Sequence, residues 1–186
     1  MYCPNCDSEV KSSVRVISET YPVKGEDITI DAHVRFCDCC GNDLWDENLD
    51  AQNLLDAFAA YRKRHNLLQP ADIRATREKY GLSQTAFARV LGFGDKTITR
   101  YENGSIADAA QNNLIMLVDQ PSDFAYLLEK NKEKISTADY ETALAALDQL
   151  RCRFIYKDSK KAYTYSTNEG IKYSMTPKRW GDRNYA

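Results

Sequence analysis

The sequence predicts a mainly α-helical chain with a small β ribbon at its N-terminus. Two cysteine pairs, Cys3/Cys6 and Cys37/Cys40, each with two intervening residues, indicate a ribbon held by a metal. Apolar residues recur at helical spacing from about residue 48 to residue 150. This pattern predicts a bundle of about five helices, followed by a helical C-terminal extension.

The four cysteines Cys3, Cys6, Cys37 and Cys40 are the predicted metal ligands. Two pairs of this spacing place four thiolates around one tetrahedral Zn²⁺. Segments this short cannot bury enough apolar surface to fold alone, and a structural metal supplies the missing stabilisation. Because four thiolates leave no open position for water, we expect structural and not catalytic zinc.

A disulfide framework is the alternative interpretation of the cysteines. Disulfides between the two pairs would leave Cys39 and Cys152 unpaired. Disulfides also need an oxidising compartment, and the first residues show neither the basic nor the apolar region of a signal peptide. Cys39 could replace a neighbour as ligand, but only the choice of Cys37 and Cys40 repeats the first spacing. His33, on the polar side of a strand, and His65, at the end of a charged helix, are interpreted as solvated surface residues.

Charge is distributed unevenly along the chain, although the net charge is only −2. Residues 1–60 hold four basic against twelve acidic side chains, and residues 61–104 hold nine against four. Residues 105–150 hold three against eight, and residues 151–186 hold nine against three. The basic middle segment is where we expect phosphate contacts, and the acidic head favours a protein partner, plausibly a basic one.

Strands and then a connecting helix are predicted for the first third of the chain. Apolar and polar residues alternate over 28–36, and residues 14–17 and 21–23 are candidate partner strands on the other side of a turn at 24–27. The connecting helix has an apolar stripe and a basic last turn. The stripe consists of Leu49, Leu54, Leu55, Phe58 and Tyr61.

Four further helices follow in quick succession. Pro70 and Gly81 bracket the first, and Ser83 is a good N-cap for the second, which ends at Gly92. Asp95 is the expected cap of the third helix, from Lys96 to about Asn103, and the fourth runs over 108–119 with Leu114, Ile115, Leu117 and Val118 directed inward. Two short helices around a glycine-containing turn predict a helix-turn-helix.

The third of these helices separates packing residues from candidate DNA-reading residues. Ile98 and Tyr101 share one side, whereas the opposite side is polar and cationic. Such a helix in a major groove could place Arg100 on guanine. Ser83 and Gln84, which begin the second helix, are expected to meet a phosphate. The candidate DNA-binding residues are Lys96, Thr99, Arg100, Asn103, Ser83 and Gln84. The alternative is a helical bundle with an ordinary polar face.

Two motifs, LSQTAFA at 82–88 and ITRYENG at 98–104, resemble the Xre/Cro-type helix-turn-helix. Together with Cys-Pro-Asn-Cys at 3–6, Phe-Cys-x-x-Cys at 36–40 and Gly-Phe-Gly at 92–94, they resemble the MqsA family of zinc-binding antitoxins, also called YgiT-type zinc-finger proteins. The resemblance covers roughly residues 1–118. Each motif is moderately common, but their order and spacing are specific.

The resemblance implies an antitoxin of a type II toxin–antitoxin pair. In that family the zinc domain neutralises an mRNA-cleaving toxin, and a homodimeric helix-turn-helix domain represses its own operon at a palindrome. The family's two base-reading positions fall on Lys96 and Arg100; the family has Asn where Lys96 stands, which implies a different operator sequence. A stand-alone zinc-containing transcriptional regulator is the alternative. We expect a cytoplasmic protein with no enzymatic activity and no membrane segment.

The C-terminal part departs from the family pattern. Helices are expected over 121–135 and 137–153, the second with an apolar stripe of Tyr140, Leu144, Leu147 and Leu150. From residue 154 the chain is basic and aromatic, which predicts irregular structure or a weak hairpin. An ordered pair of strands packed on the domain is the alternative. The predicted domains are a zinc ribbon at 1–46, a connecting helix at 47–66, the helix-turn-helix domain at 67–120, a helical extension at 121–153 and a basic aromatic tail at 154–186.

Overall fold

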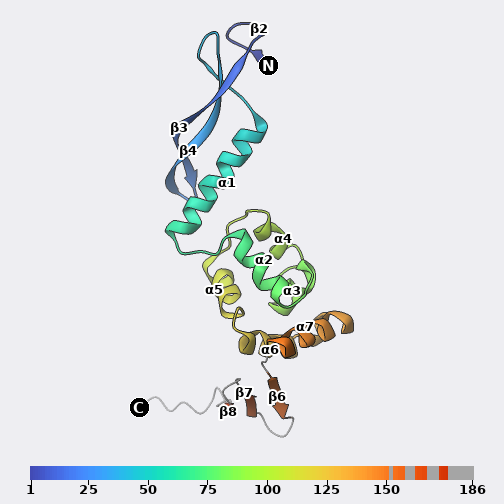
Figure 1. The fold of residues 1–186 in the computed structure, drawn as a ribbon. Helices are drawn as coiled ribbons and strands as arrows, with labels where there is room; N and C mark the ends of the chain where they lie inside the picture. Colours follow the sequence, from blue (N-terminus) through green and yellow to red (C-terminus); the bar gives the residue numbers. More distant parts are fainter. Residues whose placement is uncertain (151–152, 158–161, 167–171, 176–186) are drawn as a thin grey trace, which may run out of the picture. The chain divides into compact units, whose positions relative to one another are not determined.

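The structure is a computed structural model that describes residues 1–150, 153–157, 162–166 and 172–175. The chain forms two compact units (Figure 1). The first contains Met1–Gln69 together with Gly104–Ile106, and the second contains Pro70–Asn103 and the chain from Ala107 onward.

A long antiparallel hairpin dominates the first unit. Strand β3 (Ser12–Val23) pairs along its whole length with β4 (Glu26–Cys37), so the two separate partner strands predicted at 14–17 and 21–23 are one strand. Lys24 and Gly25 form the two-residue turn with φ angles of 49° and 85°. Two successive positive φ values match the right-handed twist of a hairpin, and glycine adopts them without a Cβ clash.

Three short strands lie at the cysteine-bearing end of this hairpin. Strand β1 (Tyr2–Cys3) pairs with β2 (Ser8–Glu9), and β5 (Asp43–Leu44) pairs with the end of β4. These pairings bring the first ten residues and the segment after β4 into compact turns. Each turn carries one of the two cysteine pairs.

Helix α1 (Glu47–Arg64) packs against the hairpin (Figure 1). Asp46 caps it by accepting hydrogen bonds from the backbone N–H groups of Asn48 and Leu49. Ala57 is fully buried in a cluster with Val23 and Ile28, near the turn of the hairpin. The predicted apolar stripe was partly wrong, because Leu54 and Leu55 are 43% and 41% exposed.

A buried asparagine on α1, outside the predicted apolar stripe, binds the hairpin. Asn53 is fully buried, and its side-chain amide accepts from the His33 N–H at 2.9 Å and donates to the His33 carbonyl at 3.0 Å. The amide therefore satisfies both backbone groups of one β4 residue, as a neighbouring strand would. This contact turns the face of α1 that meets the sheet away from Leu54 and Leu55.

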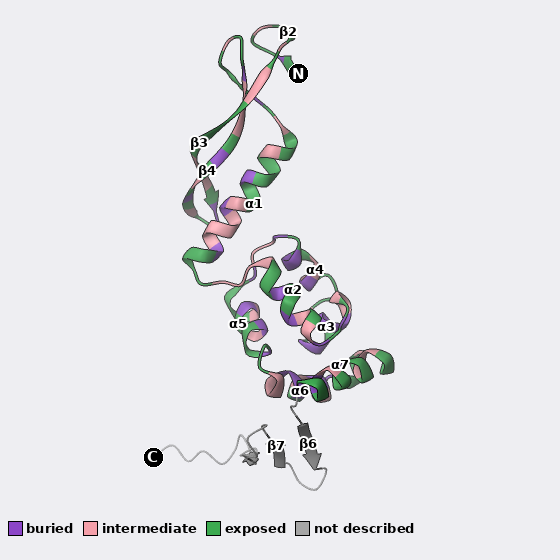
Figure 2. Cartoon of the chain, viewed as in Figure 1, coloured by how far each residue is buried: buried purple, intermediate pink, exposed green. Residues whose placement is uncertain are grey.

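The second unit begins with four helices, α2 (Pro70–Lys79), α3 (Gln84–Val90), α4 (Thr97–Glu102) and α5 (Ala109–Leu117). Ala86, Phe87 and Val90 on α3 are buried, and so are Ile98 and Tyr101 on α4. Figure 2 shows buried stretches on both helices. Asp108 caps α5 through the Gln111 N–H. One expectation was wrong, since Leu117 is 54% exposed while Ile115 and Val118 fill the core.

The helical extension packs onto these four helices. It comprises α6 (Pro121–Lys130), a short 3₁₀ turn (Lys132–Lys134) and α7 (Thr137–Gln149). The rings of Tyr80 and Phe124 stack with centroids 3.6 Å apart, and the Tyr80 hydroxyl donates to the Val118 carbonyl at 2.7 Å. These contacts join the residue that follows α2, and the end of α5, to α6 in one core.

Helix α7 is shorter and less buried than the sequence predicts. It ends at Gln149, and a strand begins at Arg153. Leu147 is buried as expected, but Leu144 and Leu150 are 41% and 38% exposed. Ala143 occupies the buried position instead, one turn before Leu147.

A three-stranded antiparallel sheet follows α7, where either irregular structure with a weak hairpin or an ordered pair of strands was expected. Its strands are β6 (Arg153–Lys157), β7 (Ala162–Ser166) and β8 (Lys172–Met175), with β7 in the centre. The remaining basic and aromatic residues of the predicted tail, at 160–161 and 176–186, lie outside the described residues.

Candidate functional site

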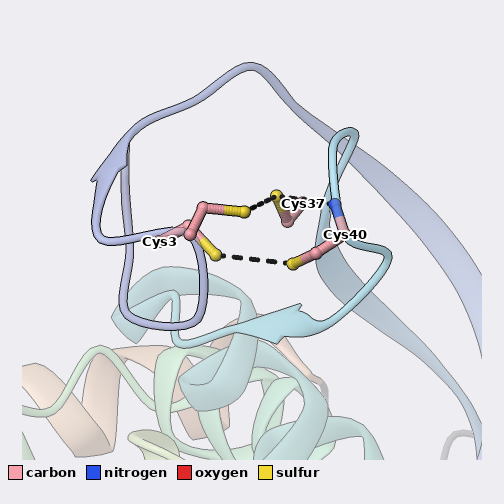
Figure 3. Close-up of side chains that lie close together, drawn as sticks. Cys3, Cys37 and Cys40 are labelled. Carbon is pink, nitrogen blue, oxygen red and sulfur yellow. Dashed lines mark hydrogen bonds between the residues drawn. The ribbon is translucent and has the colours of Figure 1, made fainter.

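Four thiols converge at one end of the first unit. Cys3 ends β1 and Cys6 lies in the turn between β1 and β2, whereas Cys37 ends β4 and Cys40 lies in the turn that follows it. Figure 3 shows Cys3, Cys37 and Cys40 with their side chains directed toward one another. The Sγ atoms of Cys3 and Cys40 are 3.6 Å apart, and those of Cys6 and Cys37 are 3.9 Å apart. All four sulfur atoms lie within 4.8 Å of one another. The structure thus brings together the four residues predicted as metal ligands.

The geometry of this cluster fits a tetrahedral metal. Four thiolates at the Zn–S distance of about 2.3 Å have their sulfur atoms about 3.8 Å apart, close to the two separations in the cluster. The Cys37 sulfur also accepts hydrogen bonds from the backbone N–H groups of Cys39 and Cys40, each at 3.4 Å. These bonds orient the sulfur. The donor set suits Zn²⁺ as a structural ion.

The thiols influence one another's ionisation. A hydrogen bond from the Asn42 backbone and another from the Asn5 side chain lower the pKa of Cys40 to about 6. The pKa of Cys6 is raised, first by its interaction with Cys40 and then by burial. Once one thiolate has formed, a second negative charge this close is unfavourable without a cation. A divalent cation supplies the charge that allows all four thiolates to form.

The other candidate ligands lie outside this cluster. Cys39 is exposed, and so is His33, in agreement with its expected place on the polar side of a strand. The His65 ring nitrogen Nε2 lies 3.0 Å from the Glu26 carboxylate. The cysteine cluster therefore rests on Cys3, Cys6, Cys37 and Cys40.

The second candidate site is the polar side of α4 in the second unit. Lys96, Arg100 and Asn103 are exposed, opposite the buried Ile98 and Tyr101. The predicted cap was wrong: α4 begins at Thr97, and Lys96 holds the N-cap position without a side-chain hydrogen bond.

Asp95 instead binds Arg89, which explains why it does not cap α4. Its carboxylate accepts two hydrogen bonds from the Arg89 guanidinium, at 2.9 and 2.8 Å. Arg89 is in the last turn of α3, so this ion pair ties the end of α3 to the turn before α4. Both side chains are about half exposed.

The remaining predicted DNA-binding residues are joined by hydrogen bonds within the protein. Gln84 accepts a hydrogen bond from the Thr99 hydroxyl at 2.8 Å and donates to the Glu102 carboxylate at 2.7 Å. The Ser83 hydroxyl caps α3 by accepting from the Ala86 N–H at 3.1 Å. Gln84 thus fixes the start of α3 against the middle of α4.

A buried ion pair supports this connection. The Arg77 guanidinium donates to both Glu102 oxygens, at 2.6 and 3.0 Å, and to the Leu82 carbonyl at 2.9 Å. The Glu102 carboxylate is fully buried. Burial opposes its ionisation, but the hydrogen bonds from Arg77 and Gln84 outweigh burial, and the pKa of Glu102 is lowered. The carboxylate therefore stays charged and holds α2, α3 and α4 together.

Sequence reasoning missed this network, although a signal was available. Glu102 is four residues after the inward-facing Ile98, so the helical period places both on the buried side of α4. A charged residue on a buried helix face needs a partner of opposite charge. Arg77 fulfils that role, but the pairing depends on how α2 and α4 pack, which one sequence does not reveal.

Comparison with known families agrees with the cysteine cluster. A family model described as the antitoxin component of the bacterial toxin–antitoxin system, MqsA, matches residues 1–129. The chain belongs to this family. The matched region contains the four clustered cysteines and extends through helices α1–α5 into α6. A search of curated proteins found no match.

The chain is longer than the region that the family model covers. Residues 130–186, which include α7 and the three-stranded sheet, follow the matched region. Among the helices that the structure describes, none combines the length and the apolar composition needed to span a membrane.

Proposed function

We propose that this antitoxin is also a sequence-specific DNA-binding repressor that regulates its own operon. Its first unit binds and neutralises a toxin, and its second unit binds operator DNA as a homodimer. Membership of the antitoxin family is the observation that carries the proposal. The exposed cationic side of α4 supports the DNA-binding part.

In this proposal α4 is the recognition helix. Arg100 contacts a guanine edge in the major groove, and Lys96 contacts a base edge or a phosphate. In the part of the chain that the structure describes, neither side chain has a hydrogen bond or salt bridge, so both are available to DNA. Asn103 extends the same surface at the end of the helix.

Gln84, Thr99 and Ser83 complete the proposed DNA surface. Gln84 and Thr99 hold each other through a 2.8 Å hydrogen bond, which orients two polar groups at the edge of the recognition helix. Exposed Ser83 lies beside Gln84 and is proposed to face a phosphate. In a homodimer, two such surfaces about 34 Å apart would match successive major grooves of a palindrome.

The first unit is proposed to hold the toxin, with Zn²⁺ as a structural ion. Zinc holds the two cysteine-bearing turns in place. Protein groups, and not the zinc ion, make every polar contact with the toxin. The surplus of acidic side chains in residues 1–60 suits a basic partner such as a nucleic-acid-cleaving toxin. With four thiolate ligands the zinc site has no open position for a reaction, so we propose no catalytic activity.

Replacing Arg100 with alanine is expected to weaken binding to the operator by about 1–3 kcal/mol, roughly a factor of 5 to 150. The reason is the loss of a bidentate contact with guanine. Titration of a labelled duplex from the chain's own promoter measures the effect. The matched control is Lys134→Ala, which removes an exposed cation outside α4 and should leave the affinity unchanged. Equal affinity of Arg100→Ala and wild type would refute the role assigned to Arg100.

A stand-alone regulator without a toxin is the second candidate function. Both units would have the same structure, but the first unit would bind another partner. The two candidates differ in whether a neighbouring gene encodes a toxic protein that this chain neutralises.

A further inference from the structure

The two edges of the hairpin in the first unit differ in how they are covered. The outer edge of β4 is occupied, because β5 pairs with it at Arg35 and Phe36 and the Asn53 side chain binds both backbone groups of His33. The outer edge of β3 is open: among the strands that the structure describes, β4 alone pairs with β3. An uncovered strand edge is a template for pairing with another chain.

The turn of the hairpin determines which backbone groups of β3 point outward. The two-residue turn of Lys24 and Gly25 makes its flanking residues, Val23 and Glu26, a hydrogen-bonded pair. Hydrogen-bonded and non-hydrogen-bonded pairs then alternate along the antiparallel ladder. Every second residue of β3 therefore directs its backbone away from β4. These outward-directed residues are Ser12, Val14, Val16, Ser18, Thr20 and Pro22.

The contact of Asn53 agrees with this register. His33 lies opposite Val16, so its N–H and C=O point away from β3, and Asn53 binds them at 2.9 and 3.0 Å. The N–H and C=O of Val16 point the other way, and no strand in the described part of the chain meets them. Asn53 thus fills on β4 the place that a further strand would fill on β3.

The half of β3 nearer the cysteines has the properties of a pairing surface. Val14 and Val16 are 44% and 57% exposed, although β-branched side chains pack well against a neighbouring strand. Proteins commonly protect a strand edge with charged residues, proline or a bulge. Pro22 protects the end near the turn, because it has no N–H. The outward-directed residues from Ser12 to Ser18 include neither a charged residue nor a proline, and their ladder with β4 has no bulge.

This edge adjoins an acidic face of the hairpin. Side chains alternate along a strand, so the outward-directed residues of β3 share one face with their direct partners on β4, and α1 packs on the other face. On the shared face β4 contributes Asp27 and Asp31, both exposed. The positive charge of Arg35, on the same face, is bound by Asp46 at 2.7 Å. A segment that pairs with β3 therefore meets apolar side chains and exposed negative charge.

We propose that an extended basic segment of the toxin adds a strand to the edge of β3 between Ser12 and Ser18. This inference rests on the proposed function of the first unit as a toxin-binding domain. Main-chain hydrogen bonds to the outward-directed groups hold the added strand, Val14 and Val16 contact its apolar side chains, and the acidic face attracts its cations. A second copy of this chain is a poorer occupant, because residues 1–60 of both copies carry twelve acidic against four basic side chains.

Amide-resolved hydrogen exchange on the full-length chain, alone and with the product of the adjacent open reading frame, tests this pairing without a variant. In the chain alone, the amides of Arg15 and Ile17 should exchange slowly because they bond to β4, whereas those of Val14, Val16 and Ser18 should exchange fast. In the complex the three fast amides should slow by about tenfold or more.

Two results of the exchange experiment would overturn the proposal. One is unchanged fast exchange of Val14, Val16 and Ser18 in the complex. The other is protection of these amides in the chain alone that increases with its concentration, because a second copy would then occupy the edge.

Val16→Pro and Val16→Thr are matched variants of the proposed edge. The Val16 N–H points outward, so proline removes no hydrogen bond to β4, and an edge strand tolerates it there. Proline should weaken binding of the neighbour's product by about tenfold or more, since it removes a donor and its ring obstructs the added strand. Threonine keeps the N–H and the branched shape, and should bind with nearly wild-type affinity. Wild-type affinity of Val16→Pro would contradict the proposal; if this variant does not fold, the exchange experiment decides.

The acidic face has its own test. Asp27→Asn combined with Asp31→Asn should weaken the complex and make its affinity less dependent on salt. Unchanged affinity and unchanged salt dependence would contradict a basic segment as the occupant.

A toxin could bind the first unit without using β3, and these measurements separate the two cases. If wild type forms no complex with the neighbour's product, the toxin-binding function and the pairing with β3 both fail. If a complex forms while Val14, Val16 and Ser18 still exchange fast, the toxin-binding function stands and only the pairing with β3 fails.

Discussion

The variant Cys37→Ser is expected to unfold the cysteine-bearing end of the first unit and to leave the helices of the second unit intact. A structural zinc site contributes on the order of 10 kcal/mol to folding, and removal of one thiolate removes most of that contribution. Cys37 is fully buried and its sulfur accepts two backbone hydrogen bonds. Serine would leave both N–H donors poorly satisfied in addition to weakening the metal site.

The structure also predicts where this unfolding stops. The cysteine cluster packs with Leu44 in one apolar group, whereas Val23, Ile28 and Ala57 form a separate group near the hairpin turn. Hydrogen exchange should therefore lose protection mainly in the turns at 3–10 and 37–44. Far-UV circular dichroism should retain its helical signal. Chelation of the metal from wild type should reproduce both effects.

The neighbouring cysteine provides a matched control. Cys39→Ser makes the same chemical change two residues away, but Cys39 is exposed and lies outside the cluster. This variant should keep the zinc content and the exchange protection of wild type. Equal loss of zinc in the two variants would show that the ligand set is wrong. Loss of all secondary structure on chelation would contradict two units with separate cores.

The second large effect is expected from Arg77→Met, which should destabilise the second unit by about 3–5 kcal/mol. The Arg77 side chain is 13% exposed, and its partner, the Glu102 carboxylate, is fully buried. Methionine leaves this carboxylate without its main counter-charge and the Leu82 carbonyl without its donor. Urea unfolding, followed by circular dichroism, measures the loss.

Arg89→Met is the matched control for this prediction. Arg89 also forms a bidentate ion pair, with Asp95, but its side chain is 45% exposed and that of Asp95 is 51% exposed. An ion pair in water contributes about 0–1 kcal/mol, so this variant should lose little stability. If both arginine variants lost the same free energy, burial would not be the reason for the strength of the Arg77–Glu102 pair.

The fold was predictable where a local signal determines it. The alternation over residues 28–36 appears as β4, and Pro70, Ser83 and Asp108 mark the starts of helices as expected. Predictions were wrong where a tertiary contact overrides the local signal. Asn53 turns α1 by binding the His33 backbone. Ala143 takes the buried position that the apolar stripe of α7 assigned to larger residues.

The metal site was more predictable than the geometry of the second site. Spacing alone selected Cys3, Cys6, Cys37 and Cys40, because two-residue gaps restrict how cysteines meet a metal. On α4 the helical period separated buried from exposed residues correctly. It could not show that Asp95 pairs with Arg89, because that pairing depends on the path of the turn before α4.

Co-expression with the product of the adjacent open reading frame tests the central claim most directly. The account predicts that this neighbour is toxic alone, that the chain restores growth, and that the two proteins co-purify. It also predicts that Cys37→Ser loses rescue and co-purification, whereas Arg100→Ala retains both. A harmless neighbour, or rescue without a stable complex, would contradict the assignment of the first unit as a toxin-binding domain.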